Sequence, residues 1–142
     1  MSVVCILLVD DFEPFRLFVI STIKKQPELQ VICEESDGSV AVQKARDLQP
    51  HLVLLDIGLP TLNGIEAARQ ILLPAPESKI LFVSQQSSFA IVQAAFDLGA
   101  RGYVVKSDAG RELLPAINAV LRGERYVSSS LAGHEFFKAE DA

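Results

Sequence analysis

The sequence predicts a doubly wound α/β domain, in which five parallel strands form one sheet and helices cover both of its faces. Short runs of valine, isoleucine and leucine recur along the chain, as expected of strands that are buried on both faces. Between these runs lie segments whose apolar residues repeat with the helical period, and the connecting loops are short. This alternation is typical of parallel strands joined by right-handed crossovers. The length of 142 residues suits one such domain.

The first strand and helix are marked by an apolar run and a proline. Residues 2–9 are apolar after the initial serine and lead into a pair of aspartates. Pro14 then suits the first turn of a helix, where its missing N–H costs no hydrogen bond, and Pro27 marks the end of that helix. On its apolar side the helical period allows either Phe18 or Val19. A shorter strand follows at 29–33.

The third strand delivers a carboxylate to its carboxyl end. A helix with Ser36 or Asp37 as its N-cap precedes it and ends before Pro50. The apolar run after His51 then reaches Asp56, and turn-forming residues follow. A charged side chain at the end of a strand buried on both faces is costly unless it has a function.

The second half of the chain repeats the alternation of strands and helices. Its two strands end in a hydroxyl group and an ammonium group, and glycines or prolines close its helices. In order, the elements are a helix from Asn63-Gly64 to Pro74, a strand over 79–84, a helix capped by Ser87 or Ser88 and closed by Gly99, a strand over 102–105 before Lys106, and a helix over about 108–121 closed by Gly123.

The periodic pattern ends after Gly123. We therefore expect the domain to cover residues 1–123 and a linker or flexible C-terminal tail to cover 124–142, in which 134–138 extend as a frayed helix at most.

The composition excludes several classes of protein. The net charge of −5, from 13 basic and 18 acidic residues, repels a phosphate backbone, so this chain alone is not expected to bind nucleic acid. No apolar run approaches the roughly 20 residues of a membrane span, and no secretory signal opens the chain, so we expect a cytoplasmic protein without a membrane contact. Cys5 and Cys33 lie in strand-like runs, so we expect them to be small core residues.

Polar side chains follow four of the predicted strands. Because parallel strands end at one edge of the sheet, Asp10, Asp11, Asp56, Ser84 and Lys106 should converge there. Two acids about 4 Å apart repel by about 4 kcal/mol at an effective dielectric near 20, so three acids must bind a cation or take up protons. Mg²⁺ suits a group with oxygen ligands only. The lysine and serine supply donors for phosphoryl oxygens, and a carboxylate can attack phosphorus, so we predict that Asp56 is a phosphate acceptor.

With these residues in this order, the chain resembles a response-regulator receiver domain of two-component signalling over about residues 3–123. The matching motifs are VDD at 9–11, LDIGLP at 55–60 followed by Asn63-Gly64, Val83-Ser84, and GARGY at 99–103 leading to Val105-Lys106. The resemblance implies a flavodoxin-like (βα)5 fold with strand order 2-1-3-4-5. It also implies a phosphoacceptor domain rather than an enzyme, limited to Mg²⁺-dependent self-phosphorylation from small donors and self-dephosphorylation.

The same resemblance implies a role for each site residue. By this resemblance, Asp56 accepts the phosphoryl group and contacts Mg²⁺, and Lys106 pairs with the phosphate. Asp11 binds Mg²⁺ directly, Asp10 helps through water, and the carbonyl of Gly58 is a further ligand. Ser84 is the switch hydroxyl, and Tyr103 is the aromatic residue whose rotamer follows Ser84. One departure is Gln85, where receivers usually have a small residue. With Gln86 beside it, this long amide is expected to slow phosphorylation, to slow loss of the phosphate or to alter the switch.

The resemblance also implies partners. The phosphoryl donor would be a sensor histidine kinase or a phosphotransfer protein, and phosphorylation would favour a homodimer through either the first and fifth helices or the fourth helix and fifth strand. Residues 112–127 are similar to receivers of LuxR-type transcription factors, in which a helix-turn-helix domain follows a linker. We expect either a fragment of such a transcription regulator or a stand-alone receiver. The alternative is a protein-interaction module of the same fold that is never phosphorylated.

Overall fold

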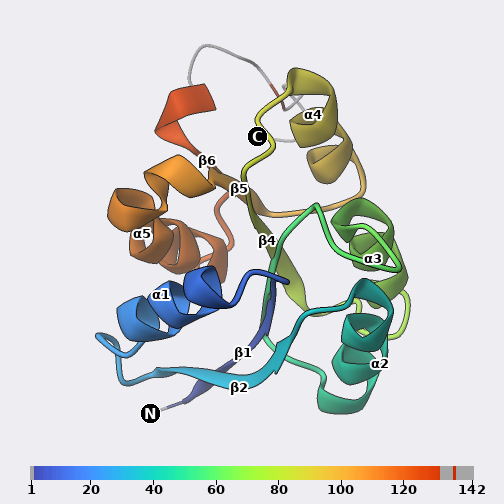
Figure 1. The fold of residues 1–142 in the computed structure, drawn as a ribbon. Helices are drawn as coiled ribbons and strands as arrows, with labels where there is room; N and C mark the ends of the chain where they lie inside the picture. The colour runs from blue at the N-terminus through green and yellow to red at the C-terminus, as the bar shows by residue number, and fades with distance from the viewer. Residues whose placement is uncertain (1, 132–135, 137–142) are drawn as a thin grey trace.

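The computed structural model confirms the predicted doubly wound α/β fold (Figure 1). The structure describes residues 2–131 and residue 136. Within these residues one sheet has six parallel strands in the order β2-β1-β3-β4-β5-β6, so the predicted order of the first five is confirmed. The strands are β1 (Val4–Val9), β2 (Leu29–Glu35), β3 (Leu52–Leu55), β4 (Lys79–Ser84), β5 (Gly102–Val105) and β6 (Tyr126–Val127).

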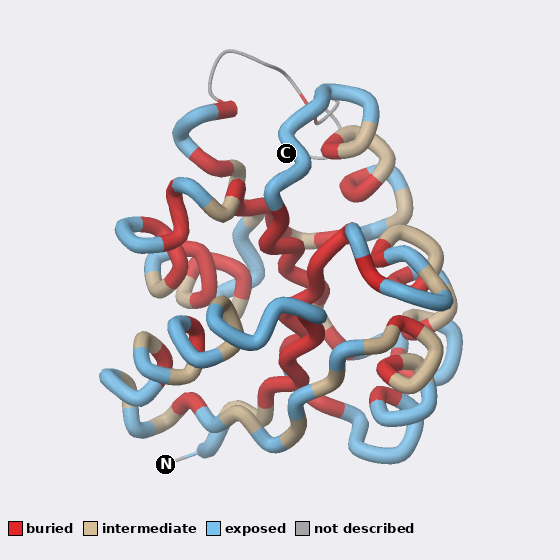
Figure 2. The backbone as a smooth tube through the Cα atoms, viewed as in Figure 1, coloured by how far each residue is buried: buried red, intermediate tan, exposed pale blue. Residues whose placement is uncertain are grey.

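Helices cover both faces of the sheet, and the buried strands form the centre of the molecule (Figures 1 and 2). Because side chains alternate along a strand, Ile6 and Leu8 of β1 pack on one face and Leu7 and Val9 on the other. The face with Ile6 and Leu8 carries α1 (Glu13–Ile23) and α5 (Ala109–Leu121). The face with Leu7 and Val9 carries α2 (Gly38–Leu48), α3 (Gly64–Ile71) and α4 (Phe89–Asp97).

No helix within the described residues has the length and apolar character needed to cross a bilayer.

The structure resolves the capping alternatives that the sequence left open. Asp37 caps α2, Asn63 caps α3 and Ser88 caps α4, each by accepting backbone N–H groups of the first turn. Hydrogen bonds from the hydroxyls of Thr61 and Ser39 lower the pKa of Asp37 to about 2. These caps set where each helix begins after its strand, and so where the loops at the carboxyl edge of the sheet lie.

The sixth strand was not predicted. Tyr126 and Val127 pair in parallel with Gly102 and Tyr103 of β5, and a 3₁₀ turn, η2 (Ser129–Leu131), follows. A strand of two residues is too short to show a period of two, so no local pattern indicates it. The frayed helix expected at 134–138 lies outside the described residues, apart from Phe136.

Close backbone contacts hold the loop between β3 and α3. A Cβ atom added to Gly64 would lie 2.0 Å from the carbonyl oxygen of Asp56, and one added to Gly38 would lie 1.9 Å from the carbonyl oxygen of Leu62. The Gly64 N–H also donates to the carbonyl of Ile57 at 2.7 Å. Neither position has room for a side chain, so glycine at these two positions lets the chain after β3 fold back beside Asp56.

We expect Gly64→Ala to lower the free energy of unfolding by about 2–3 kcal/mol, because the new methyl group meets main-chain atoms that cannot rotate away. Gly110→Ala in α5 is the matched control, since its added Cβ meets nothing within 4 Å, and it should be neutral or stabilising by about 0.5–1 kcal/mol. Urea denaturation of the two variants checks this. Equal stabilities would contradict the steric account.

Candidate functional site

A cavity of about 280 Å³ opens at the carboxyl edge of the sheet. Side chains from the ends of β1, β3, β4 and β5 meet there, as the strand order requires. Of the residues predicted for the site, Asp10 and Tyr103 lie beside the cavity rather than in its wall. Its wall is formed by Asp11, Phe12, Asp56, Gly58, Ser84, Gln85, Gln86 and Lys106.

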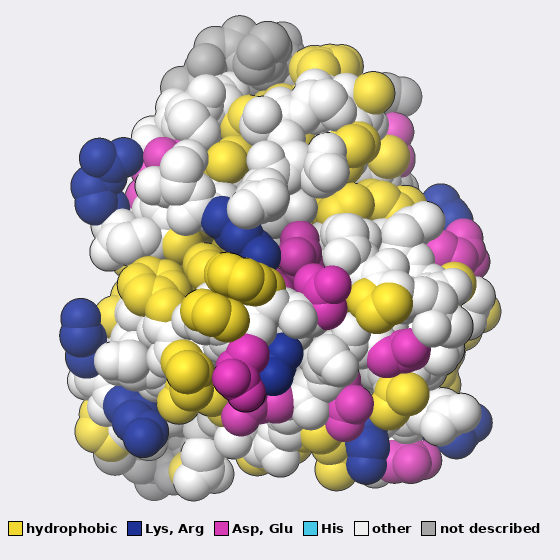
Figure 3. Space-filling model, viewed as in Figure 1, with side chains coloured by type: hydrophobic (Ala, Val, Ile, Leu, Met, Phe, Trp, Pro, Cys, Tyr) yellow, Lys and Arg dark blue, Asp and Glu magenta, His cyan; other side chains and the backbone are white. Residues whose placement is uncertain are grey.

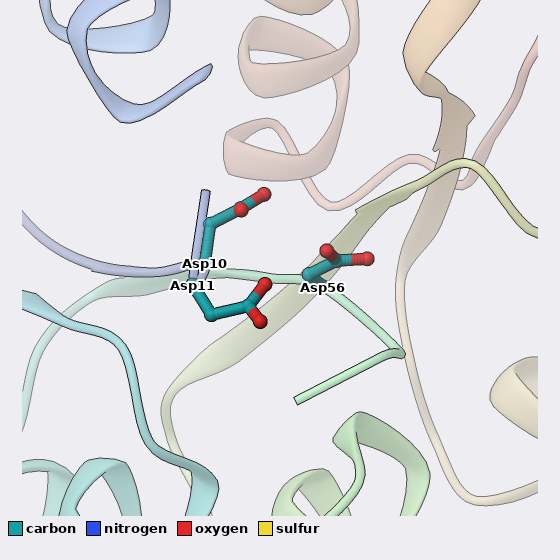
Figure 4. A group of neighbouring side chains, drawn as sticks. All are labelled: Asp10, Asp11 and Asp56. Carbon is teal, nitrogen blue, oxygen red and sulfur yellow. The ribbon is translucent and has the colours of Figure 1, made fainter. Parts of the chain in front are cut away.

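Three carboxylates form the acidic part of the site. Asp10, Asp11 and Asp56 each offer an oxygen, and these oxygens lie within 4.8 Å of one another. Figure 4 shows the three side chains gathered between the ends of β1 and β3. Asp10 and Asp56 are buried, whereas Asp11 is exposed and forms no hydrogen bond or ion pair with another described residue. The cluster is therefore open to solvent on the side of Asp11.

Lys106 joins two of these acids. Its ammonium group lies 2.8 Å from Asp10 Oδ2 and 3.1 Å from Asp56 Oδ2, and 4.5 Å above the centre of the Phe15 ring. Burial alone would lower the pKa of Lys106, but the two carboxylates raise it. Burial raises the pKa of Asp10, although the ammonium group and the Phe12 N–H oppose this effect. Three carboxylates and one ammonium group leave a net negative charge that attracts a further cation.

The donor atoms of the cluster fit a hard divalent ion. Carboxylate oxygens are the ligands that Mg²⁺ prefers, and the group contains no histidine nitrogen or cysteine sulfur. Asp56 Oδ1 accepts the N–H of Ile57 at 2.7 Å, and this bond fixes the orientation of the carboxylate. Asp10, Asp11 and Asp56 are therefore the side chains that would hold Mg²⁺.

Two hydroxyl groups hold the loop after β4 in place through hydrogen bonds to its main chain. Ser84 Oγ accepts the N–H of Gln86 at 3.1 Å, and the Tyr103 hydroxyl donates to the carbonyl of Gln86 at 2.7 Å. Both hydroxyl-bearing residues are buried, and burial raises the pKa of Tyr103 to about 12. Gln86 therefore connects the cavity wall at Ser84 with the aromatic ring of β5. Gln85, beside it, is exposed at the cavity mouth.

The aromatic residues around α1 were not predicted to be part of the site. Phe12 is 58% exposed and lines the cavity, and Phe15 lies under the ammonium group of Lys106. Of the two residues that the helical period left open, Val19 is buried, and Phe18 is exposed. The place of Phe12 directly after Asp11 in the sequence could have indicated that it lies at the site. The position of Phe15 could not be predicted in this way, because the side of α1 that faces the sheet follows only from packing.

Comparisons with known proteins agree with this geometry. The family model for the response regulator receiver domain matches residues 6–118. The chain is 33% identical over 132 residues to the transcriptional regulatory protein LiaR of Bacillus subtilis, covering 90% of this chain and 61% of that protein. It is 31% identical to the response regulator GacA of Pseudomonas protegens, covering 94% of this chain and 63% of GacA. The chain thus spans less than two thirds of the length of these curated relatives.

A solved structure gives the same result. The crystal structure of a two-component response regulator of the LuxR family from Aurantimonas sp. SI85-9A1 matches with a TM-score of 0.87 at 36% identity, covering 92% of this chain and 94% of that one. Receiver domains are phosphoacceptors rather than catalytic enzymes. The family model, the relatives and the shared fold show that this chain belongs to the response regulator receiver domain family of two-component signalling.

Proposed function

We propose that this receiver accepts a phosphoryl group on Asp56 from a sensor histidine kinase or a phosphotransfer protein, and that it changes conformation in response. The observation that carries the proposal is the position of the Asp56 carboxylate, in the wall of a cavity that Asp11 and Lys106 also line, with the Lys106 ammonium group 3.1 Å from it. A carboxylate in this position can act as a nucleophile toward phosphorus. The groups that would pair with the phosphoryl oxygens already lie around it.

The reaction follows from these contacts. A carboxylate oxygen of Asp56 forms a bond to phosphorus, the bond between phosphorus and the donor atom breaks, and the donor keeps that electron pair. Lys106 pairs with one phosphoryl oxygen, and the Ser84 hydroxyl donates to another. Asp11, Asp10, Asp56 and the Gly58 carbonyl would hold Mg²⁺, which neutralises charge on the phosphoryl oxygens when bound. The product is an aspartyl phosphate.

The surface of α1 supports a protein donor. Phe12, just before this helix, and Leu17 and Phe18 within it are exposed, and Figure 3 shows hydrophobic side chains gathered over α1 beside acidic side chains. Exposed aromatic and aliphatic side chains next to a reactive site mark a protein interface. We propose that the phosphoryl donor docks on this surface and presents its phosphorylated side chain to Asp56.

The relatives support an output in transcription. LiaR is a transcriptional regulatory protein, and this chain covers 61% of its length. We propose that the receiver works in the cytoplasm and controls transcription through a DNA-binding domain that lies outside these 142 residues, while this chain alone binds no nucleic acid because of its negative charge. The alternative is a stand-alone receiver, or an interaction module that is never phosphorylated.

Incubation with Mg²⁺ and a small phosphodonor should add one phosphoryl group to the protein, as measured by intact-mass spectrometry. Asp56→Asn should abolish the adduct, because an amide cannot attack phosphorus in this way. Asp47→Asn, at an exposed position of α2, is the matched control and should be phosphorylated normally. An adduct that persists in Asp56→Asn would show that Asp56 is not the acceptor, and no adduct at all would favour the interaction module.

Asp11→Asn should weaken Mg²⁺ binding by roughly tenfold or more. Removal of one unit charge about 4 Å from a cation is worth several kcal/mol at an effective dielectric near 20, and a tenfold change needs only about 1.4 kcal/mol. Titration calorimetry with Mg²⁺ on the wild type, Asp11→Asn and Asp47→Asn measures the difference. Equal affinities of the wild type and Asp11→Asn would remove Asp11 from the proposed ligands.

Gln85→Ala should speed both phosphorylation by a small donor and hydrolysis of the phosphate. The side chain of Gln85 lines the mouth of the cavity, so its removal admits both the donor and water. We expect each rate to rise by roughly tenfold, the effect of about 1.4 kcal/mol on a barrier. Gln30→Ala, on an exposed position of β2, is the control. Unchanged rates would mean that the amide does not limit access to Asp56.

A further inference from the structure

The chain after α5 adds β6 to the edge of the sheet beside β5 (Figure 1). Residues 126–131 and Phe136 are here called the strap: Tyr126 and Val127 pair with β5, residues 128–131 follow at the start of α5, and Phe136 contacts α4. The strap is anchored at three places, and each is far in sequence from the strap itself. None of these contacts has a role in the proposed phosphorylation chemistry, so the strap requires its own explanation.

The first anchor closes the edge of β5. The N–H of Tyr126 donates to the carbonyl of Arg101 at 3.1 Å, and the N–H of Ser128 donates to the carbonyl of Tyr103 at 2.9 Å. In return, Ser128 Oγ accepts the N–H of Val105 at 3.2 Å. An open strand edge is a template for pairing with another chain, and the strap occupies this edge.

The second anchor is a pair of acids at the start of α5. The Ser128 hydroxyl and the N–H of Ser130 donate to Asp108, and this lowers the pKa of Asp108. Glu112 accepts the Tyr126 hydroxyl at 2.7 Å and the N–H of Ser129 at 3.0 Å. Burial opposes ionisation of Glu112, yet these donors leave its pKa lowered. Hydrogen bonds therefore hold the strap at this anchor, and Leu131, which follows them, is buried in the hydrophobic core.

The third anchor is aromatic and rests on α4. The Phe136 ring stacks on Phe89 with a centroid distance of 5.1 Å and contacts Phe96 at 6.0 Å. Gln93 Nε2 donates to the Phe136 carbonyl at 3.1 Å. Phe136 is only 5% exposed, whereas Phe89 remains 49% exposed. The anchor is thus a buried ring packed along α4, from Phe89 in the first turn to Phe96 in the last.

The seat of this ring is joined directly to the functional site. Phe89 is the first residue of α4, and the four residues before it, 85–88, are exposed and include two that line the cavity. Hydrogen bonds that join Ser84 and Tyr103 to the main chain of Gln86 position this loop. Tyr103 also holds the strap through its own carbonyl. One short loop and one strand residue therefore link the cavity to the first and third anchors.

We infer that the strap is a releasable latch, closed on β5 and α4 while Asp56 is unmodified and loosened when Asp56 carries a phosphoryl group. The inference rests on the proposed phosphorylation of Asp56. A phosphoryl oxygen that draws the Ser84 hydroxyl toward it weakens the bond from Gln86, and the loop and Phe89 then move away from Phe136. By linkage, a change that opens the latch must favour the phosphorylated state, by up to the factor by which phosphorylation opens the latch.

Hydrogen exchange on the full chain tests the first half of this inference. With Mg²⁺ and beryllofluoride, a non-covalent analogue of the phosphoryl group, the amides of Tyr126, Ser128 and Leu131 should exchange at least about tenfold faster, while those of β1 and β3 stay protected. Binding of the analogue is measured separately by calorimetry. If the analogue binds and the strap amides stay protected, the latch is refuted and the proposed function stands. If the analogue does not bind, both the latch and the proposed function are refuted.

Variants at the aromatic anchor test the second half. Without the analogue, Phe136→Ala should speed hydrogen exchange at the Leu131 amide by about tenfold. The same variant should bind Mg²⁺ and beryllofluoride more tightly than the wild type. The gain in affinity should be at most the factor by which the analogue speeds exchange in the wild-type strap. Phe136→Leu should restore most of the protection. Leu73→Ala, which removes an exposed apolar side chain elsewhere, is the control and should change neither quantity. Faster exchange without tighter binding would show that the strap is only structural.

Discussion

The structure depends on one electrostatic constraint, which is the placement of three carboxylates within 4.8 Å of one another at the edge of a buried sheet. Pairs of such charges repel by several kcal/mol even when partly screened. Lys106 makes the arrangement tolerable because its ammonium group lies between Asp10 and Asp56 and over the face of the Phe15 ring. The ends of β1, β3 and β5 are therefore joined by one network of ion pairs.

The backbone around β3 is fixed by close packing. Gly64 brings the start of α3 against the main chain of Asp56, and Gly38 brings α2 against the loop that contains Leu62. The Ile57 N–H then fixes one carboxylate oxygen of Asp56. Rigid strands and glycine contacts thus hold the acids in place, whereas the loop after β4 is exposed and is held through the main chain of Gln86. Any response to a new charge in the cavity is expected in that loop.

The periodicity of the sequence predicted the parallel sheet and the convergence of Asp56, Ser84 and Lys106, because buried parallel strands have a strong signal and topology places their ends together. The contact of Phe15 with Lys106 and the position of the strap had no such signal. The two-residue strand β6 is stabilised by pairing with β5, and Phe136 is buried by Phe89 and Phe96, which lie 40 or more residues away. Contacts of this kind depend on the assembled tertiary structure and not on local pattern.

The charge of the site explains why a phosphoryl group would act on this loop and not on the strands. The acids and Lys106 already carry a net negative charge, and an aspartyl phosphate would replace the single charge of Asp56 with about two. The strands cannot relax, because they are buried on both faces and paired on both edges in the region of the site. The Ser84 hydroxyl and the Gln86 main chain can relax, and the residue at the far end of that loop is Phe89, on which the strap is seated. The exposed loop that joins the site to the C-terminal segment is therefore where a response to the new charge is expected.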